Sequence, residues 1–254
     1  MDFKRGSLEV MIKPRVIARM DIKSSNLIKS INLEGLKIIG NPNEYAKKYY
    51  EEGADEILFM DCVATLYGRN NLSEIINQST KDIFIPIAVG GGIRSLDDVK
   101  MMLNSGADKV AVNTAAVNDP QFITVLANLI GSQSIIISIE AKKRDQNWEV
   151  YTSNGRDPTG KDVVEWAKEV EKLGAGEILL TSIDQEGTRK GFDIELVKAV
   201  TSAINLPVIC SGGFGRIYHA KKLIDSCQIS AIALADALHY KRHKLFEIKK
   251  GLAI

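Results

Sequence analysis

The chain has 254 residues, of which 45% are hydrophobic and 26% are charged, and its formal net charge is +1 at pH 7. This size and composition are typical of a soluble globular protein with a sizeable core. The balanced charge argues against a nucleic-acid surface or an acidic tail, and no stretch approaches the roughly 18 apolar residues that a membrane span needs.

The N-terminus and the cysteines indicate a cytoplasmic protein. Residues 1–13 carry several charges and lack the apolar core of a signal peptide. The cysteines show no metal spacing and are interpreted as small hydrophobic residues in a reducing compartment. We therefore expect no metal site and no cofactor. The cysteines are Cys62, Cys210 and Cys227.

Short β-branched runs alternate with longer amphipathic runs along the chain. The short runs are almost continuously apolar, which is typical of strands buried on both faces. Strands are expected at Arg15–Asp21, Glu56–Asp61, Ile85–Gly90, Lys109–Asn113, Ser134–Glu140, Glu177–Ser182, Pro207–Ser211 and Ser230–Ala235. Helices are expected at about 42–53, 71–82, 95–105, 119–130, 160–173, 193–204, 216–226 and 244–250.

Two longer insertions interrupt this alternation. A loop is expected over Ser24–Asn41, after the first strand. A second insertion, Lys143–Thr159, follows the fifth strand, and Trp148–Thr152 within it reads as a small hairpin. In the third helix, Ser95 followed three residues later by Asp98 predicts a capped start.

An internal repeat has an offset of 121 residues. The stretch Ile85–Ile93 returns as Leu206–Phe214, and Gly53–Leu58 returns as Gly174–Leu179. Eight strand–helix units with a twofold repeat predict a (β/α)8 TIM barrel with a twofold half-barrel repeat rather than an open sheet. We expect one domain over residues 1–254, with half-barrels at about 14–130 and 131–250.

Carboxylates follow two opposite strands of the expected barrel. Asp21 ends the first strand and Glu140 ends the fifth. Working groups of such barrels lie at the C-terminal ends of the strands, so the two acids would face each other across the mouth as a base and an acid. A single strand-end acid more often caps a helix or pairs with a nearby lysine, such as Lys23 or Lys142. The opposed pair favours the catalytic interpretation.

Glycine-rich turns follow two other strands, at Gly90–Gly92 and Ser211–Gly213. Asn113 and Thr114 lie beside one turn in the expected barrel, and Ala235 and Asp236 lie beside the other. Backbone N–H groups in such turns can hold an anion, although tight turns also need glycine. Two anion sites on opposite sides of the mouth would suit a substrate with a phosphate at each end.

Several motifs carry a resemblance that runs from Arg15 to Tyr240. They are Ala88–Ile93, Gly106–Val110, Asn113–Ala116, Gly131–Gln133 and Gly174–Asp184. The chain resembles the cyclase subunit family of imidazole glycerol phosphate synthase. The resemblance implies a lyase of histidine biosynthesis that uses ammonia to convert a bisphosphorylated aminoimidazole carboxamide ribulosyl substrate (PRFAR) to imidazole glycerol phosphate and AICAR. It also implies a cytoplasmic heterodimer with a HisH-like glutaminase docked at the N-terminal face of the barrel.

The resemblance further assigns roles to individual residues. The catalytic group would be Asp21, Glu140, Lys23 and Lys29. The substrate- and phosphate-binding group would be Gly91, Gly92, Asn113, Thr114, Asn154, Gly155, Thr181, Glu186, Gly187, Ser211, Gly212, Gly213, Ala235 and Asp236. A ring of four charges would gate the ammonia passage, although it could also be a stabilising bottom layer of the barrel. The ring is Arg15, Glu56, Lys109 and Glu177.

Three residues depart from the family's pattern, and all three touch the acceptor pocket. The family has aspartate where this chain has Glu140 and Glu186, and a small serine where this chain has Asp236. One extra methylene moves a carboxyl by roughly 1 Å, a displacement that can cost about 10²-fold in rate. A carboxylate about 4 Å from a phosphate repels it by roughly 4 kcal/mol per unit charge, unless it turns away or pairs with a cation.

These departures leave alternative functions open. One is a paralogue that passes ammonia to an acetamido sugar in LPS, O-antigen or flagellar sugar biosynthesis, where Asp236 would be harmless. Another is a non-catalytic barrel that only docks a glutaminase. A third is a related half-barrel sugar isomerase, which would have the two acids but no need for the charged ring.

Overall fold

The computed structural model describes residues 13–63 and 72–254. The N-terminal stretch that argued against a signal peptide lies outside these ranges apart from Lys13, and so does residue 71 of one expected helix. Among the helices of the described ranges, none is both long and apolar enough to cross a membrane.

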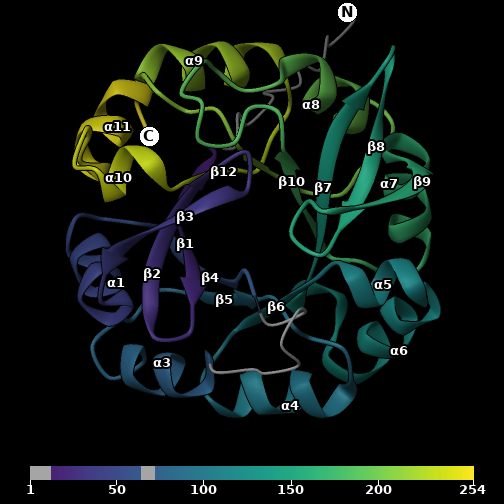
Figure 1. The fold of residues 1–254 in the computed structure, drawn as a ribbon, viewed down its shortest axis with the longest axis horizontal. Helices are drawn as coiled ribbons and strands as arrows, with labels where there is room; N and C mark the ends of the chain where they lie inside the picture. Colours follow the sequence, from purple (N-terminus) through teal and green to yellow (C-terminus); the bar gives the residue numbers. More distant parts are fainter. Residues whose placement is uncertain (1–12, 64–71) are drawn as a thin grey trace, which may run out of the picture.

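Eight parallel strands close into a barrel, and helices surround it (Figure 1). The strands in order around the barrel are β1 (Arg15–Lys23), β4 (Glu56–Asp61), β5 (Ile87–Gly90), β6 (Lys109–Val112), β7 (Ile135–Arg144), β10 (Glu177–Ser182), β11 (Val208–Ser211) and β12 (Ala231–Leu234). Pairing of β12 with β1 closes the ring. The predicted (β/α)8 TIM barrel is therefore confirmed.

The helices that cover the barrel follow the expected alternation with the strands. They are α1 (Pro42–Glu51), α3 (Leu72–Ser79), α4 (Leu96–Asn104), α5 (Thr114–Asn118), α6 (Gln121–Ile130), α7 (Val163–Lys172), α8 (Ile194–Thr201), α9 (Ile217–Ser226), α10 (Asp236–His239) and α11 (Leu245–Leu252), with a 3-10 turn at Ser132–Ser134. The predicted cap of α4 is present: the Ser95 hydroxyl accepts from the backbone N–H of Asp98, whose carboxylate accepts from the N–H of Ser95.

The strands are apolar throughout because both of their faces are buried. Alternate residues of β1, such as Val16 and Met20, pack outward against the helices in the main hydrophobic cluster. Ile17, on the opposite face of β1, points inward and clusters with Ile136 and Leu179 from the other side of the barrel. The barrel interior is thus a packed core and not an open pore.

The repeat of the sequence corresponds to equivalent positions in the barrel. The strands β4 and β5 lie 121 residues before β10 and β11, and each pair is four strands apart in the ring. The helices α1 and α7 have the same offset. Figure 1 shows the two sets on opposite sides of the barrel axis. The boundary between the two half-barrels stays a prediction.

The insertion expected as a loop over Ser24–Asn41 is instead an antiparallel pair, so that prediction was wrong. The strands β2 (Asn26–Ile31) and β3 (Glu34–Gly40) extend from β1 over the mouth (Figure 1). Positive φ values at Ser24 in one turn, and at Asn32 and Leu33 in the other, reverse the chain. Asparagine tolerates this conformation better than most residues, whereas Ser24 and Leu33 adopt it without that preference.

The second insertion contains the expected hairpin in a larger form. An extension of β7 pairs with β8 (Asn147–Thr152), which pairs in turn with β9 (Asp157–Asp162). The following helix therefore begins at Val163 rather than at residue 160, with the Asp162 side chain accepting hydrogen bonds from two N–H groups of its first turn. The short helix α5 was not expected from the sequence.

Candidate active site

The carboxyl ends of the strands form the mouth of the barrel, and two pockets indent it. One lies over β11 and β12, and the other lies over the ends of β4 to β7. The first pocket includes seven of the predicted binding residues: Glu186, Gly187, Ser211, Gly212, Gly213, Ala235 and Asp236. The second includes Gly91, Gly92, Asn113, Thr114 and Asn154, together with Glu140. Each predicted glycine turn thus lines a pocket, and the binding of an anion in these pockets stays a prediction.

Asp21 is completely buried at the end of β1. Its Oδ1 accepts a hydrogen bond from Arg19 Nε at 2.9 Å, and its Oδ2 lies 3.8 Å from Lys29 Nζ. Burial by itself would raise the pKa of this carboxyl, but the charges of Arg19 and Lys29 outweigh it and lower the pKa below its ordinary value. Asp21 is therefore an anion at neutral pH.

Glu140 is buried on β7, on the other side of the mouth. Its Oε2 accepts hydrogen bonds from Asn113 Nδ2 at 3.2 Å and from the backbone N–H of Gly155 at 2.8 Å. Burial raises the pKa of Glu140 to about 7, even though Arg19 and the Gly155 N–H oppose the shift. A carboxyl with this pKa can both give and take a proton at neutral pH.

The two acids therefore occupy opposite sides of the barrel but have different charges. The strands β1 and β7 are four places apart in the ring of eight. Asp21 is held as an anion, whereas Glu140 is close to half protonated at pH 7. Two carboxyls whose surroundings push their pKa values apart are suited to separate roles in one reaction.

The predicted lysines lie in different surroundings. Lys29 is buried on β2 and donates a hydrogen bond to the Glu186 carboxylate. It therefore links Asp21 to the loop after β10. Lys23 is exposed at the end of β1. Among the described residues, the ion pairs of Asp21 are with Arg19 and Lys29, so the alternative that Asp21 pairs with Lys23 is wrong.

Arg19 is a functional candidate that the sequence analysis missed. It lies in the barrel interior, where its Nη1 donates to the hydroxyls of Thr181 at 3.0 Å and Ser211 at 3.1 Å. The predicted binding residue Thr181 thus lies beneath the pockets and holds Arg19. The signal was present in the alternation of β1, since Arg15, Arg19 and Asp21 all fall on its inward face.

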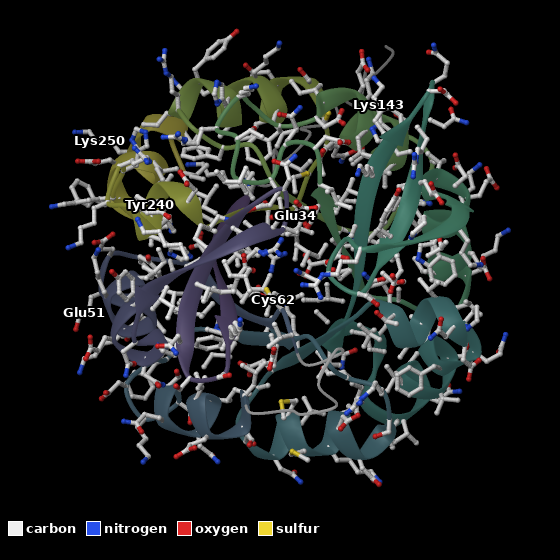
Figure 2. All side chains as sticks on the ribbon, in the orientation of Figure 1. Glu34, Glu51, Cys62, Lys143, Tyr240 and Lys250 are labelled. Carbon is white, nitrogen blue, oxygen red and sulfur yellow. The ribbon has the colours of Figure 1, made fainter. Side chains whose placement is uncertain are left out.

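Cys62 is also part of this region. It follows β4, is buried, and lies close to the barrel axis in Figure 2. Burial raises the pKa of its thiol well above the ordinary value, and the Asp21 carboxylate adds to the shift. Cys62 is therefore a neutral thiol at physiological pH, in agreement with its interpretation as a small hydrophobic residue.

The glycines of both turns are needed for close packing of the backbone. Gly91 has a φ of +89°, and a Cβ there would lie 2.1 Å from the carbonyl oxygen of Asp61. Gly213 has a φ of +100°, and a Cβ there would lie 2.0 Å from the carbonyl oxygen of Gly191. Any other residue at these two positions would be strained and would clash with a neighbouring loop.

The carboxylates of the pocket over β11 and β12 have cationic partners. Asp236 Oδ1 lies 3.3 Å from Arg242 Nε and 3.9 Å from Arg189 Nε, and Glu186 is bonded to Lys29. Because Asp236 is paired with cations, it would repel a phosphate less strongly than an unpaired carboxylate. The pocket is therefore better able to accept an anion than its sequence suggests.

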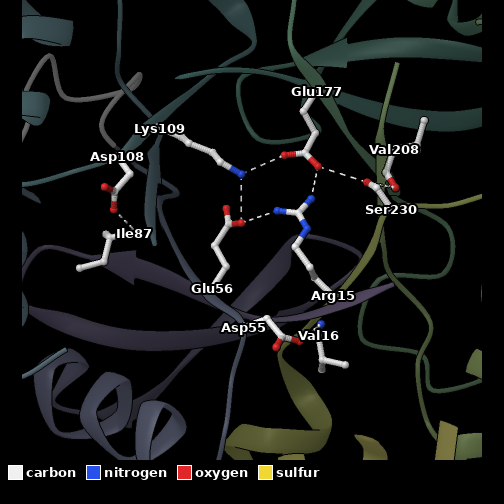
Figure 3. Close-up of polar contacts among 10 residues, drawn as sticks. All are labelled: Arg15, Val16, Asp55, Glu56, Ile87, Asp108, Lys109, Glu177, Val208 and Ser230. Atoms are coloured by element: carbon white, nitrogen blue, oxygen red, sulfur yellow. Dashed lines mark hydrogen bonds and ion pairs between the residues drawn. The ribbon is translucent and has the colours of Figure 1, made fainter. Parts of the chain in front are cut away.

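The predicted charged ring is closed at the amino-terminal end of the barrel (Figure 3). Arg15 bridges the two carboxylates from one side, at 2.5 Å from Glu56 and in a second contact with Glu177. Lys109 bridges them from the other side, at 3.1 Å and 3.2 Å. The Glu177 carboxylate also accepts a hydrogen bond from Ser230. The four charges neutralise one another in the isolated chain.

Within residues 13–63 and 72–254, no group of three or more His, Cys, Asp or Glu side chains is arranged so that it could hold a metal ion. The absence of a metal and of a cofactor stays a prediction.

Comparison with known proteins places the chain among enzymes of one pathway. A family model described as histidine biosynthesis protein matches residues 15–244. A relative from Legionella pneumophila is 61% identical over 208 residues, which are 82% of this chain and 98% of the relative. Relatives from Dehalococcoides mccartyi and Pyrococcus furiosus are each 45% identical, over 95% and 96% of this chain and 96% of their own length. All three are named imidazole glycerol phosphate synthase subunit HisF.

Proposed function

The chain belongs to the HisF family of imidazole glycerol phosphate synthase subunits, and on that premise we propose how its barrel carries out the reaction. It is the cyclase subunit of that enzyme in histidine biosynthesis, and hence a lyase. The substrate at the mouth is PRFAR, which reacts with ammonia to give imidazole glycerol phosphate and AICAR. The observation that carries this proposal is the opposed pair Asp21 and Glu140, with one pocket on each side.

The roles of the two acids follow from their charges. Ammonia adds to the ketone of the substrate, and the adduct must then lose its hydroxyl group as water, which requires a proton on the departing oxygen. Glu140, close to half protonated at pH 7, supplies that proton and can later accept another during ring closure. Asp21 remains a carboxylate and stabilises the positive charge of the imine that forms.

The two pockets hold the ends of the substrate. Glycine turns let a ligand approach the backbone N–H groups closely, at Gly91 and Gly92 on one side and at Gly212 and Gly213 on the other. A phosphate in each pocket would leave the reacting carbons between the two acids. No metal is required for this arrangement.

Turnover with ammonia tests this function without a partner. Purified protein, PRFAR and ammonium salt at mildly alkaline pH should give product. Glu140→Gln should lower turnover by about 10²–10⁴-fold, the usual contribution of a general acid–base group. Asp21→Asn should abolish it, whereas Glu51→Gln, on an exposed carboxyl of α1, should leave it unchanged. Turnover that survives Asp21→Asn would contradict the proposed role of that residue.

The glutaminase partner docks at the amino-terminal face, where the ring of Arg15, Glu56, Lys109 and Glu177 lies. In support, the ring is at the end of the barrel opposite to the acids, and its fully paired charges would have to separate to let ammonia pass. The complex works in the cytoplasm, with no nucleic acid or membrane as partner.

The gate has its own test, which compares two ammonia sources. In the complex with a HisH glutaminase, Glu177→Gln should change the glutamine-dependent rate while the rate with ammonium salt stays within about twofold, because free ammonia can reach the mouth directly. Lys47→Met, on an exposed pair of α1, should change neither rate. If both rates change equally in Glu177→Gln, the ring is a stabilising layer and not a gate.

A second acceptor remains a candidate because two acids occupy the pocket over β11 and β12. Glu186 and Asp236 both line it, and a phosphate would have to share the pocket with them. An acetamido sugar offers hydroxyl and amide donors to such carboxylates instead of a repelling charge. If PRFAR neither reacts nor binds, and Asp236→Ser restores its binding, the second acceptor is favoured.

A further inference from the structure

Arg19 is a charged side chain in the barrel interior to which the proposed reaction gives no role. It is only 2% exposed and lies two residues before Asp21 on the same face of β1. A buried guanidinium is costly unless its donors are paired, and this one is paired with a carboxylate and two hydroxyls.

We propose that Arg19 is a positioning residue that fixes Asp21 as a carboxylate with one oxygen not engaged in a hydrogen bond and thereby leaves proton transfer to Glu140. The inference rests on the proposed function, since it assigns the division of labour between the two acids. It concerns a residue that does not touch the substrate and that acts through Asp21.

The Arg19 guanidinium is held rigidly. Its Nη1 uses both N–H groups, one for Thr181 on β10 and one for Ser211 on β11, while Nε donates to Asp21 on β1. Three anchors on three strands define the plane of the group. A planar donor held in this way imposes its orientation on the carboxylate that it binds.

The two carboxylate oxygens of Asp21 differ in their contacts. Oδ1 is occupied by Arg19, whereas Oδ2 is buried and has no hydrogen-bond partner among the described residues. The Lys29 ammonium lies 3.8 Å from Oδ2 but donates its hydrogen bond to Glu186 instead. A buried acceptor without a partner is unusual, and at this site it is the oxygen left for a positively charged reaction intermediate.

Charged and titratable groups from several elements face the two acids. Around Asp21 they are Arg19 on β1, Lys29 on β2, Cys62 after β4, Glu140 on β7, Glu186 after β10 and His239 in α10. His239 is neutral because burial, together with the charge of Lys29, lowers its pKa to about 3. Of the described residues, Arg19 and Asp21 are the charged groups that shift the pKa of Glu140, and Asp61 and Arg94 line the same pocket. Arg19 thus acts on both acids.

The test follows the ionisation of Asp21 directly. Protein carrying ¹³Cγ-labelled aspartate is titrated by NMR, and the signal of Asp21 is identified by its loss in Asp21→Asn. The wild-type signal should titrate below the ordinary range of an aspartate. In Arg19→Gln the midpoint should rise because burial is no longer opposed by the nearer cation. The exposed Arg144→Met serves as control and should leave the midpoint unchanged. An unchanged midpoint in Arg19→Gln would overturn the proposal.

A second variant separates charge from orientation. Arg19→Lys keeps a cation but loses the planar fork, so Asp21 should stay ionised while ammonia-dependent turnover falls by about 10²-fold, as expected for a displacement of roughly 1 Å. Full turnover in Arg19→Lys overturns the positioning role, and this result decides the matter even if Arg19→Gln does not fold.

The two parts of the experiment also separate this inference from the function on which it rests. The NMR titration needs no substrate, so its outcome is independent of what the acceptor is. Wild-type protein that does not convert PRFAR would count against the proposed function alone. A normal wild-type rate, combined with an Asp21 midpoint that is the same in wild type and in Arg19→Gln, would count against the inference alone.

Discussion

Replacing Glu140 by glutamine should change the way in which the stability of the barrel depends on pH. In the folded chain burial raises the pKa of Glu140 to about 7, from an ordinary value of 4.5. Between these two pH values the folded state keeps a proton that the unfolded state releases. The stabilisation from this group is therefore complete below the unfolded pKa and is lost as the pH rises through the folded pKa.

The size of the effect follows from the shift. One pKa unit corresponds to about 1.4 kcal/mol, so wild-type protein should lose about 3 kcal/mol between about pH 4.5 and about pH 8 through this residue. Because Glu140 is only 5% exposed, solvent screening takes away little of this value. In Glu140→Gln the loss is absent, since a neutral amide oxygen can still accept from Asn113 and Gly155.

Urea unfolding of the two proteins at several pH values from about 5 to about 8 measures the difference. Other titrating groups, Asp21 and Glu56 among them, are common to both proteins and cancel to first order in the comparison. The difference in unfolding free energy should shift in favour of Glu140→Gln as the pH rises. The exposed Glu51→Gln should show no such trend. A difference between wild type and Glu140→Gln that is constant with pH would refute the assignment of Glu140 as the group that titrates near neutrality.

Three further predictions concern the stability of the barrel. Lys109→Met leaves two carboxylates of the ring with Arg15 as their shared cation, so urea unfolding should show that the free energy of unfolding falls by about 3 kcal/mol. A change below about 0.5 kcal/mol would mean that the ring is not a stabilising unit. In Gly91→Ala the new Cβ would lie 2.1 Å from a backbone oxygen, so this change should lower the free energy of unfolding far more than Gly35→Ala, where the φ is also positive but nothing lies within 4 Å. Similar losses of stability in the two variants would contradict the packing argument. Ser95→Ala removes one side of a capping box and should cost about 1 kcal/mol, measured in the same way.

The fold was predictable because its signals are local and repeated. The strand at Glu56–Asp61 and its copy at Glu177–Ser182 were placed with correct bounds, since both are continuously apolar between a charged start and a polar end. The pair β2 and β3 was missed for the opposite reason. Much of β3 is exposed, so its pattern lacks the apolar face by which a buried strand is identified.

The candidate site was predictable to the extent that it lies at strand ends. Asp21 and the glycine turns follow from that rule, because any residue at the carboxyl end of a barrel strand reaches the mouth. Arg19 does not follow from it, because it lies one layer deeper. One partner of Asp236, Arg189, was also out of reach because it lies in a distant segment of the sequence, before α8, whereas Arg242 follows Asp236 closely.

The different charges of the two acids have their origin in the cations beside Asp21, which are Arg19 and Lys29. Asp21 and Glu140 lie on strands that are four places apart in the ring, β1 and β7, so the barrel by itself would treat them alike. The residue two positions earlier on the inward face is Arg19 in β1 but Ser138 in β7, and both are buried. Arg19 on its own strand and Lys29 on β2 hold Asp21 ionised, whereas Glu140 accepts hydrogen bonds from the neutral donors Asn113 and Gly155, and its pKa rises. A symmetric framework thus supplies two opposed carboxylates, and the cations beside Asp21 make it the fixed charge while Glu140 carries the proton.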